Sequence, residues 1–437
     1  MKKNLLGWMA LAALSVTAAC NKDDNSPTIR PHITTEFAAD TIEIGESVTL
    51  SPKLDIRDGV SYEWKVDNVP VSKDTAYTFK ATARGSYRVV LTAANKAGRD
   101  SGVYSIFAPG PYDLGFALIT EGWFGHGTGN LQFYSYKTNT LKDSVFLKEN
   151  PSATLGANGN TLQYGTFFNN KIYMVVKAGG PVVAVDAFTM KESARVAAGG
   201  QYTSIVGIEA NRGLIGGNAG LNEIDMTTMT VGKKINNVTG YIGNMLRAND
   251  KIFVLSQDSG IVVLKQNDYS IVKVMGKANY GFVTGTDGLI YAATGTKMWS
   301  INPYNLATDS VTLPFTVPSP WGVWRSVPMA ASTKDAYIFL APANGYQGGT
   351  KIYRYVKGNA TSVTTPFITV PSGQFIYGTG IAYNAWKDEL IVTTTNSGWG
   401  GSTNYLLFYN AKTGELKTDK TVTYSGWHFT AMPIMLQ

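Results

Sequence analysis

One pattern recurs seven times between Gly115 and Val422 of this chain. Each repeat holds an alternating apolar run, a polar turn, a second apolar run, a gap and a third run that closes on Asp, Asn or a substitute. The third runs close at equivalent positions, which are Ser135, Asp186, Asp225, Lys265, Asn302, Val356 and Asn410. A repeat of this period with several short strands in each unit is typical of a β-propeller. The sequence therefore predicts seven blades, each a four-stranded antiparallel sheet.

The spacing of the repeats predicts where extra loops lie. The intervals between the equivalent positions are 51, 39, 40, 37, 54 and 54 residues, so the insertions cluster around the first, sixth and seventh blades. The first repeat lacks its opening strand, and the segment that begins at His428 has the pattern of one. We expect this C-terminal strand to complete the first blade, because closing the ring leaves only short, protected sheet edges.

A different all-β pattern occupies residues 33–108. Short alternating strands are separated by turn signals such as Asp58-Gly59 and Arg84-Gly85, which is typical of a small β-sandwich. The strand around Trp64 and the run that begins at Gly85 resemble a PKD-like, immunoglobulin-type module, in which Trp64 is a core residue. Such modules are usually spacers. A stiff Pro-Gly-Pro linker follows at residues 109–111, and residues 112–437 form the predicted propeller.

The N-terminus has the features of an exported lipoprotein. Residues 1–19 carry two lysines and then an apolar run that is too short to cross a bilayer, which predicts a cleaved signal peptide. Residues 17–20 resemble a bacterial lipobox, which implies acylation of Cys20, the only cysteine. Residues 21–24, which include Asp23 and Asp24, resemble the acidic export signal of Bacteroidota-type surface lipoproteins, so residues 20–32 are expected to form a lipidated tether on the outer membrane, facing the cell exterior. The alternative is an ordinary secretory signal with an incidental cysteine.

Composition excludes some classes of partner. The chain is 44% apolar and 12% aromatic, which is enough for a large core. Its formal charge of +7 is spread along the sequence without a cluster of lysine and arginine, so nucleic acid is not an expected partner. With one cysteine, no disulfide can stabilise the exported fold.

Strand parity divides the propeller loops between two faces. In an antiparallel four-stranded blade, the turn between the second and third strands emerges at the same end as the connection to the next blade. We call this end the crossover face, and it receives nearly every long loop. The turns at the opposite face are tight and polar, so that face is expected to be solvated scaffolding. Asp186, Asp225 and Asn302 recur there and are interpreted as turn formers.

The crossover-face loops predict a binding surface. Aromatic residues interleaved with glycine and asparagine suit large flat or ring-shaped ligands. The candidate ligand-binding residues are Trp123, Phe124, His126, Trp321, Trp324, Tyr346, Tyr377, Trp399, Trp427 and His428. Shorter connections add Tyr164, Tyr202, Tyr241 and Tyr280 near the central channel. The alternative for any one of these rings is packing between blades.

The same face is poor in catalytic groups. Its candidate acids and imidazoles are Glu121, Glu149, Asp258, His126 and His428, which do not form a recognisable metal-ligand, paired-carboxylate or Ser/His/Asp pattern. We therefore predict no catalytic residues, no metal and no cofactor, and a binding protein rather than an enzyme. A propeller hydrolase or lyase that acts on polysaccharide is the remaining enzymatic alternative.

The blades also resemble a known family. The segments LITEGWFGHGTGNLQFYSYKTNTL, NKIYMVVKAGGPVVAVDAFTM and NMLRANDKIFVLSQDSGIVVL are similar to the YncE-like propellers of the DUF5074 family of Bacteroidota surface lipoproteins. Some relatives capture cobalamin and pass it to an outer-membrane TonB-dependent transporter. The resemblance implies a seven-bladed, non-enzymatic protein that binds a corrinoid. A glycan or a peptide would suit the same aromatic residues, and the sequence does not separate these ligands.

Overall fold

The computed structural model describes residues 29–276, 278–317, 327–342, 348–397, 401–426 and 429–436. The chain divides into two compact units, Met1–Pro109 and Gly110–Gln437, and each has its own hydrophobic core. Within the described ranges, no helix is both long and apolar enough to cross a membrane.

The N-terminal unit is a β-sandwich. Its larger sheet has the strand order β2-β9-β8-β5-β6, and two smaller sheets pair β3 with β7 and β1 with β4. The strands are β1 (Ile33–Thr34), β2 (Ala39–Thr41), β3 (Ser47–Leu50), β4 (Lys53–Leu54), β5 (Ser61–Val66), β6 (Val69–Ser72), β7 (Tyr77–Lys80), β8 (Gly85–Asn95) and β9 (Gly98–Ala108). Trp64 is fully buried among Leu50, Leu91 and Tyr104, and its Nε1 donates to the Asp74 carbonyl at 2.9 Å. Trp64 is therefore a core residue, as predicted.

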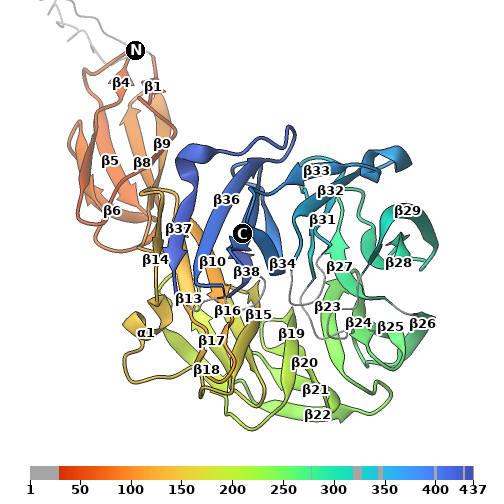
Figure 1. Cartoon of the computed structure of the whole chain (residues 1–437). Helices are drawn as coiled ribbons and strands as arrows, with labels where there is room; N and C mark the ends of the chain where they lie inside the picture. The colour runs from red at the N-terminus through yellow and green to blue at the C-terminus, as the bar shows by residue number, and fades with distance from the viewer. Residues whose placement is uncertain are drawn as a thin grey trace, which may run out of the picture. The chain divides into compact units, whose positions relative to one another are not determined.

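The second unit is a seven-bladed propeller (Figure 1). Blades 2 to 4 each take four consecutive strands. Blade 2 contains β15 (Thr161–Phe168), β16 (Lys171–Lys177), β17 (Val182–Asp186) and β18 (Glu192–Val196), and blade 3 contains β19 (Tyr202–Glu209), β20 (Arg212–Gly217), β21 (Gly220–Asp225) and β22 (Val231–Ile235). Blade 4 contains β23 (Ile242–Ala248), β24 (Lys251–Ser256), β25 (Gly260–Lys265) and β26 (Ile271–Gly276). Blades 6 and 7 follow the same plan. Blade 6 contains β30 (Met329–Ala331), β31 (Tyr337–Leu340), β32 (Lys351–Val356) and β33 (Pro366–Thr369), and blade 7 contains β34 (Phe375–Asn384), β35 (Glu389–Thr395), β36 (Thr403–Asn410) and β37 (Val422–Ser425).

The C-terminal strand completes blade 1, as predicted. This blade has the order β14-β13-β10-β38, in which β38 (Thr430–Met435) is the inner strand. The other strands are β10 (Gly115–Thr120), β13 (Leu131–Ser135) and β14 (Thr140–Lys142). β38 pairs antiparallel with β10, with Phe116 opposite Met435 and Leu118 opposite Pro433. Figure 1 shows these strands side by side although they come from the two ends of the propeller sequence.

In blade 5 one continuous element, β28 (Ile290–Ile301), contains the second and third predicted runs. The sheet of this blade also contains β27 (Tyr280–Thr284) and β29 (Thr308–Val317). The first part of β28 pairs with β27, and from Gly295 onward the strand pairs with β29. Gly295 has a φ of 56°, a conformation that glycine adopts without steric cost. The chain thus changes partner at Gly295, and the two halves of β28, which place Tyr291 and Met298 in one core cluster, correspond to the second and third predicted runs.

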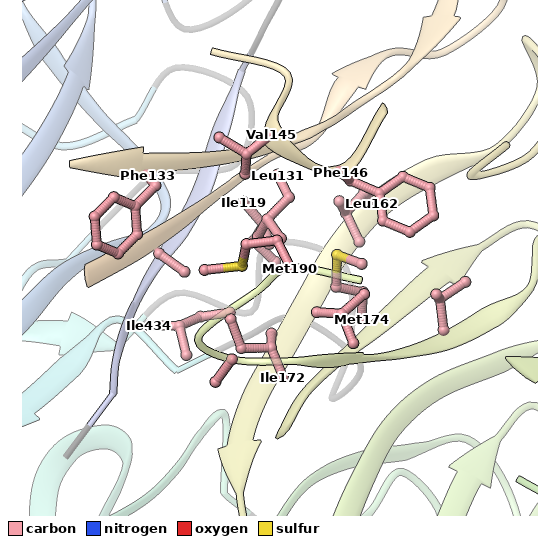
Figure 2. Close-up of a cluster of buried hydrophobic side chains, with 14 of the residues drawn as sticks. Ile119, Leu131, Phe133, Val145, Phe146, Leu162, Ile172, Met174, Met190 and Ile434 are labelled. Carbon is pink, nitrogen blue, oxygen red and sulfur yellow. The ribbon is translucent and has the colours of Figure 1, made fainter. Parts of the chain in front are cut away.

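The core of the propeller lies between neighbouring blades. The described residues form seven buried apolar clusters, one for each pair of adjacent blades. Figure 2 shows the cluster between blades 1 and 2, where Ile119 and Leu131 of blade 1 pack near Leu162 and Met174 of blade 2. Ile434 of β38 belongs to the same cluster, so the last strand contributes to the core of the ring as well as to its first sheet.

Three short helical segments lie in the part of the propeller unit that the structure describes. They are α1 (Val145–Glu149), η2 (Ala360–Val363) and η3 (Thr418–Lys420), and all three lie in connections between strands. Helix α1 buries Val145 and Phe146 in the cluster between blades 1 and 2, and it begins the long connection to β15. The repeat pattern did not predict this helix.

Candidate functional site

A small hairpin stands on the crossover face of blade 1. Between β10 and β13, strand β11 (Gly122–Trp123) pairs with β12 (Gly127–Thr128). The rings of Trp123 and His126 stack with centroids 3.4 Å apart and planes 11° from parallel. Phe124, beside them at the tip, keeps 62% of its surface exposed. The hairpin therefore presents a stacked pair of rings and an exposed phenylalanine.

Hydrogen bonds brace this hairpin on the long connection between blades 1 and 2. The Gly125 N–H donates to the Asn158 carbonyl at 2.8 Å, and Thr128 Oγ1 donates to the Ala157 carbonyl at 2.7 Å. From the same connection, Asn160 Nδ2 donates to the carbonyl of Ala178 in blade 2 at 2.8 Å. The aromatic hairpin is thereby tied to the loops of two blades.

The base of the hairpin meets the closing strand of the ring. The Glu121 N–H donates to the Phe429 carbonyl, and Gln163 Nε2 donates to the Glu121 carboxylate. The ring of Phe429 packs against that of Tyr377 with a centroid distance of 5.2 Å. Tyr377 is only 4% exposed. The structure thus places Tyr377 in the packing beneath the hairpin, and we leave it out of the binding surface.

Blades 2 and 3 present small residues on the crossover face. Their loops there are Ala178 to Gly180, Ala197 to Gly200 and Gly217 to Gly220. The Gly199 N–H donates to the Gly179 carbonyl at 2.8 Å, which joins two of these loops. Apart from the exposed Asn218, these residues have little or no side chain, so the loops offer a ligand mainly backbone N–H and C=O groups.

The structure places only part of the predicted set. Trp123, Phe124 and His126 come together on the hairpin. Six candidates lie outside the described residues: Trp321, Trp324, Tyr346, Trp399, Trp427 and His428. Tyr164 and Tyr280 are 7% and 2% exposed and belong to clusters between blades, and Tyr202 and Tyr241 pack against such clusters. These four tyrosines therefore lie in or against cores between blades rather than on an exposed aromatic surface.

The candidate acids are held separately. Glu149 Oε1 accepts a hydrogen bond from Tyr112 Oη at 2.7 Å, while the Glu121 carboxylate accepts one from Gln163. Burial, and secondarily the bond to Glu149, raises the pKa of Tyr112 well above its ordinary value. Asp258 Oδ2 accepts from Thr239 Oγ1 at 3.2 Å. In the part of the chain that the structure describes, no three His, Cys, Asp or Glu side chains are grouped to hold a metal.

The recurrent acidic and amide residues of the opposite face form turns, as predicted. Asp186 Oδ1 accepts from the N–H groups of Phe188 and Thr189 at 3.0 and 2.8 Å. Asp225, Asn302 and Asn410 make the same pair of bonds to the second and third residues that follow them. Both Asp and Asn have an Oδ1 acceptor, which explains why either residue occurs at this position.

Comparison with known proteins gives the family. Residues 114–436 match the family model described as a domain of unknown function, DUF5074. The chain belongs to the DUF5074 family. Residues 31–95 of this DUF5074 protein also match a PKD-like domain model. No curated protein matches the chain.

Two solved structures are similar to this DUF5074 protein, and the first of them supports the fold. A quinoprotein alcohol dehydrogenase-like protein, BT1487 of Bacteroides thetaiotaomicron, aligns over 93% of this chain and 99% of its own, with 19% identity and a TM-score of 0.62. PorZ, a surface component of the type-IX secretion system of Porphyromonas gingivalis, aligns over 78% of this chain and 44% of its own, with 13% identity and a TM-score of 0.40. At 19% identity, the likeness to BT1487 is one of fold alone.

Proposed function

We propose that this DUF5074 protein is a cell-surface lipoprotein that captures a corrinoid on the crossover face of its propeller and passes it to an outer-membrane TonB-dependent transporter. The observation that carries the proposal is the braced hairpin with exposed Phe124 beside the stacked rings of Trp123 and His126. Stacking on an aromatic ring contributes about 0.5–1.5 kcal/mol beyond burial. Because the hairpin is held before binding, little conformational entropy is lost when a ligand docks.

The chemistry of a corrinoid suits the surroundings of the hairpin. A corrinoid is a flat macrocycle edged with neutral amide arms. The loops Ala178 to Gly180 and Ala197 to Gly200 offer backbone groups that can bond to amides, and the hairpin offers rings for the macrocycle. A glycan or an extended peptide also combines ring or apolar faces with neutral polar groups, so these remain the competing ligands.

The hydrogen bonds of the Glu121 and Glu149 carboxylates favour a binding role rather than catalysis. Glu121 and Glu149 accept hydrogen bonds from different partners, Gln163 and Tyr112. A glycosidase needs two carboxyl groups that face one substrate. Turnover of a polysaccharide by the purified protein would overturn this part of the proposal.

The decisive experiment is calorimetric titration of the protein that begins at Asn21, which contains every described residue. Cyanocobalamin, cobinamide and a panel of glycans are titrated in turn. We expect micromolar or tighter binding of both corrinoids, and its absence would refute the corrinoid assignment. Binding of a glycan alone would favour the competing ligand class.

Two variants test whether the hairpin forms the binding surface. Phe124→Ala is expected to weaken corrinoid binding at least fivefold, equivalent to about 1 kcal/mol. Tyr304→Ala is the matched control, because Tyr304 is 72% exposed in the turn after β28, on the opposite face. Equal affinities of the two variants would remove the hairpin from the site.

The anchor is tested independently of the ligand. The proposal requires acylation of Cys20, which the resemblance of residues 17–20 to a lipobox implies. Two or three acyl chains would hold the protein on the membrane, since each buried CH₂ contributes about 0.8 kcal/mol. Cys20→Ser should abolish metabolic labelling with a fatty-acid analogue and release the protein from the membrane fraction. Unchanged labelling of this variant would rule out the anchor.

A further inference from the structure

A cavity of about 470 Å³ occupies the central channel of the propeller. It is lined by inner strands from six blades: β38, β15, β23, β27, β30 and β34. Thr333 and Ala385, which follow the last residues of β30 and β34, also line it. Because inner strands end at the face opposite the crossover face, the cavity reaches that opposite face. No residue of the aromatic hairpin lines it.

The walls of the cavity are mainly apolar. Methionine side chains contribute from several blades, including Met245, Met329 and Met432, and Phe282 and Ile381 lie among them. None of the described lining residues is charged. Methionine adapts its shape to irregular apolar surfaces, so these walls can close around ligands of different outline.

A few neutral polar groups interrupt the apolar wall. Asn244 Oδ1 accepts from the Phe282 N–H at 2.7 Å, an arrangement that fixes the orientation of the amide. Thr379 Oγ1 is buried and has no hydrogen-bond partner among the described residues. The hydroxyls of Tyr164 and Tyr383 donate to the Ile205 carbonyl and to Asp388 Oδ1, so they are already paired. The lining therefore provides the Asn244 amide and the Thr379 hydroxyl as points of polar recognition.

We propose that the channel is a second binding site, for an uncharged and mainly apolar small molecule that carries a hydroxyl or carbonyl group. Small-molecule sites are typically concavities of about 300–1,000 Å³ with apolar walls and a few placed polar groups. An ion would lose its hydration in this channel without meeting an opposite charge, so the site selects against charged ligands. This inference stands apart from corrinoid capture, because no residue of the aromatic hairpin lines the channel cavity.

The test uses two fluorescent probes that differ by one charged group. N-phenyl-1-naphthylamine is neutral, and 8-anilino-1-naphthalenesulfonate adds a sulfonate to the same ring framework. Each is titrated into the protein that begins at Asn21. We expect the neutral probe to bind one site with micromolar affinity, at least tenfold more tightly than the anion. Equal affinity for the two probes, or no binding of the neutral probe, would overturn the proposal.

Substitutions that fill the channel locate the site. Ala382 and Ala331 line the cavity from blades 7 and 6 and are half-buried, so a larger side chain at either position enters the channel. Ala382→Leu and Ala331→Leu should each weaken the neutral probe at least fivefold. Ala194→Leu, at a half-buried position of outer strand β18, is the matched control and should change affinity less than twofold. Unchanged probe binding in both channel variants would place the probe elsewhere and refute the site.

The two binding sites have separate readouts. Phe124→Ala is expected to leave the neutral probe unaffected, and the two channel variants are expected to keep their corrinoid affinity. Failure of corrinoid binding would therefore not bear on the channel, and failure of probe binding would not bear on the hairpin. Loss of probe binding in Phe124→Ala would contradict the channel assignment.

Discussion

Tyr136 donates a hydrogen bond through its Oη to Glu389 Oε1 over 2.6 Å, although the two residues are 253 positions apart. Glu389 is fully buried, and its Oε2 accepts from Lys417 Nζ at 2.7 Å. The contact joins blade 1 to blade 7, where the ring closes. The apolar cluster of this seam has only five buried residues, the fewest of the seven: Phe116, Tyr134, Ile391, Leu406 and Phe408. The polar contact supplements the smallest of these cores.

The first prediction concerns this seam. Lys417→Met should destabilise the propeller, because it leaves the buried Glu389 carboxylate without its cation. Loss of one partner of a buried ion pair lowers the free energy of unfolding by about 3–5 kcal/mol. Because the Lys417 side chain is 27% exposed, we expect a loss at or below the lower end of this range. The free energy of unfolding in urea at neutral pH measures it.

The control for the seam is a lysine at the surface. Lys412 lies near Asp335 and Asp388 but is 54% exposed, so Lys412→Met should cost less than about 1 kcal/mol. Equal destabilisation by the two substitutions would show that Glu389 and Lys417 do not contribute specifically to closure.

Buried tyrosines predict the response to alkaline pH. Burial raises the pKa of Tyr134, Tyr173 and Tyr409 from 10.0 to about 12, and burial followed by the charge of Glu389 raises the pKa of Tyr136 further. The unfolded chain loses these protons near pH 10 while the folded chain keeps them. Stability should therefore be full below pH 10 and fall as pH rises toward the folded pKa, by about 1.4 kcal/mol per pH unit for each such tyrosine.

The measurement follows tyrosinate absorbance and far-ultraviolet circular dichroism together. The tyrosines with raised pKa should ionise as the fold is lost, so their absorbance change and the unfolding transition should coincide. Complete ionisation with an intact dichroism spectrum would contradict the assignment. Tyr136→Phe should reduce by one the number of protons that the chain releases on unfolding above pH 10.

Much of the architecture could be predicted because the same strand alternation and turn residues recur in each blade of the repeat. Asn169 and Asn170 signal a hairpin turn, and both adopt positive φ, 49° and 60°, between β15 and β16. The missing first strand of blade 1 and the spare strand at the C-terminus predicted the pairing of β10 with β38. These features depend on alternation and turn residues, which the sequence displays directly.

The features that escaped prediction depend on contacts between repeats. Tyr377 is buried because Phe429, from the closing strand, packs against it, and no periodic pattern records that pair. The bond between Tyr136 and Glu389 also joins different repeats. The channel cavity depends on the combined size of side chains from six inner strands, so no single strand reveals it. Strand parity assigned each loop to one face of the propeller. It could not predict whether an aromatic ring in that loop is exposed or packed against a neighbouring blade.

The turn residues of the opposite face give a third prediction. Asp186→Ala removes the acceptor for the N–H groups of Phe188 and Thr189, and should destabilise the propeller by about 1 kcal/mol. Asp186→Asn keeps an Oδ1 acceptor, as Asn302 and Asn410 do in their own blades, and should stay within about 0.5 kcal/mol of the native protein. Thermal unfolding of the three proteins compares them, and a large loss in Asp186→Asn would show that the charge matters rather than the acceptor.

The last prediction links the binding hairpin to its backbone. A Cβ on Gly129 would lie 1.5 Å from the Thr120 carbonyl oxygen, a backbone atom that cannot turn aside, whereas a Cβ on Gly127 would meet nothing within 4 Å. Gly129→Ala should therefore displace the hairpin, alter the near-ultraviolet dichroism of the stacked Trp123 and His126, and cost about 1–3 kcal/mol of stability. Gly127→Ala, two residues away, should leave both properties unchanged. If the hairpin forms the ligand surface, corrinoid affinity should fall in Gly129→Ala alone, and equal affinity in the two variants would separate ligand binding from the geometry of Trp123, Phe124 and His126.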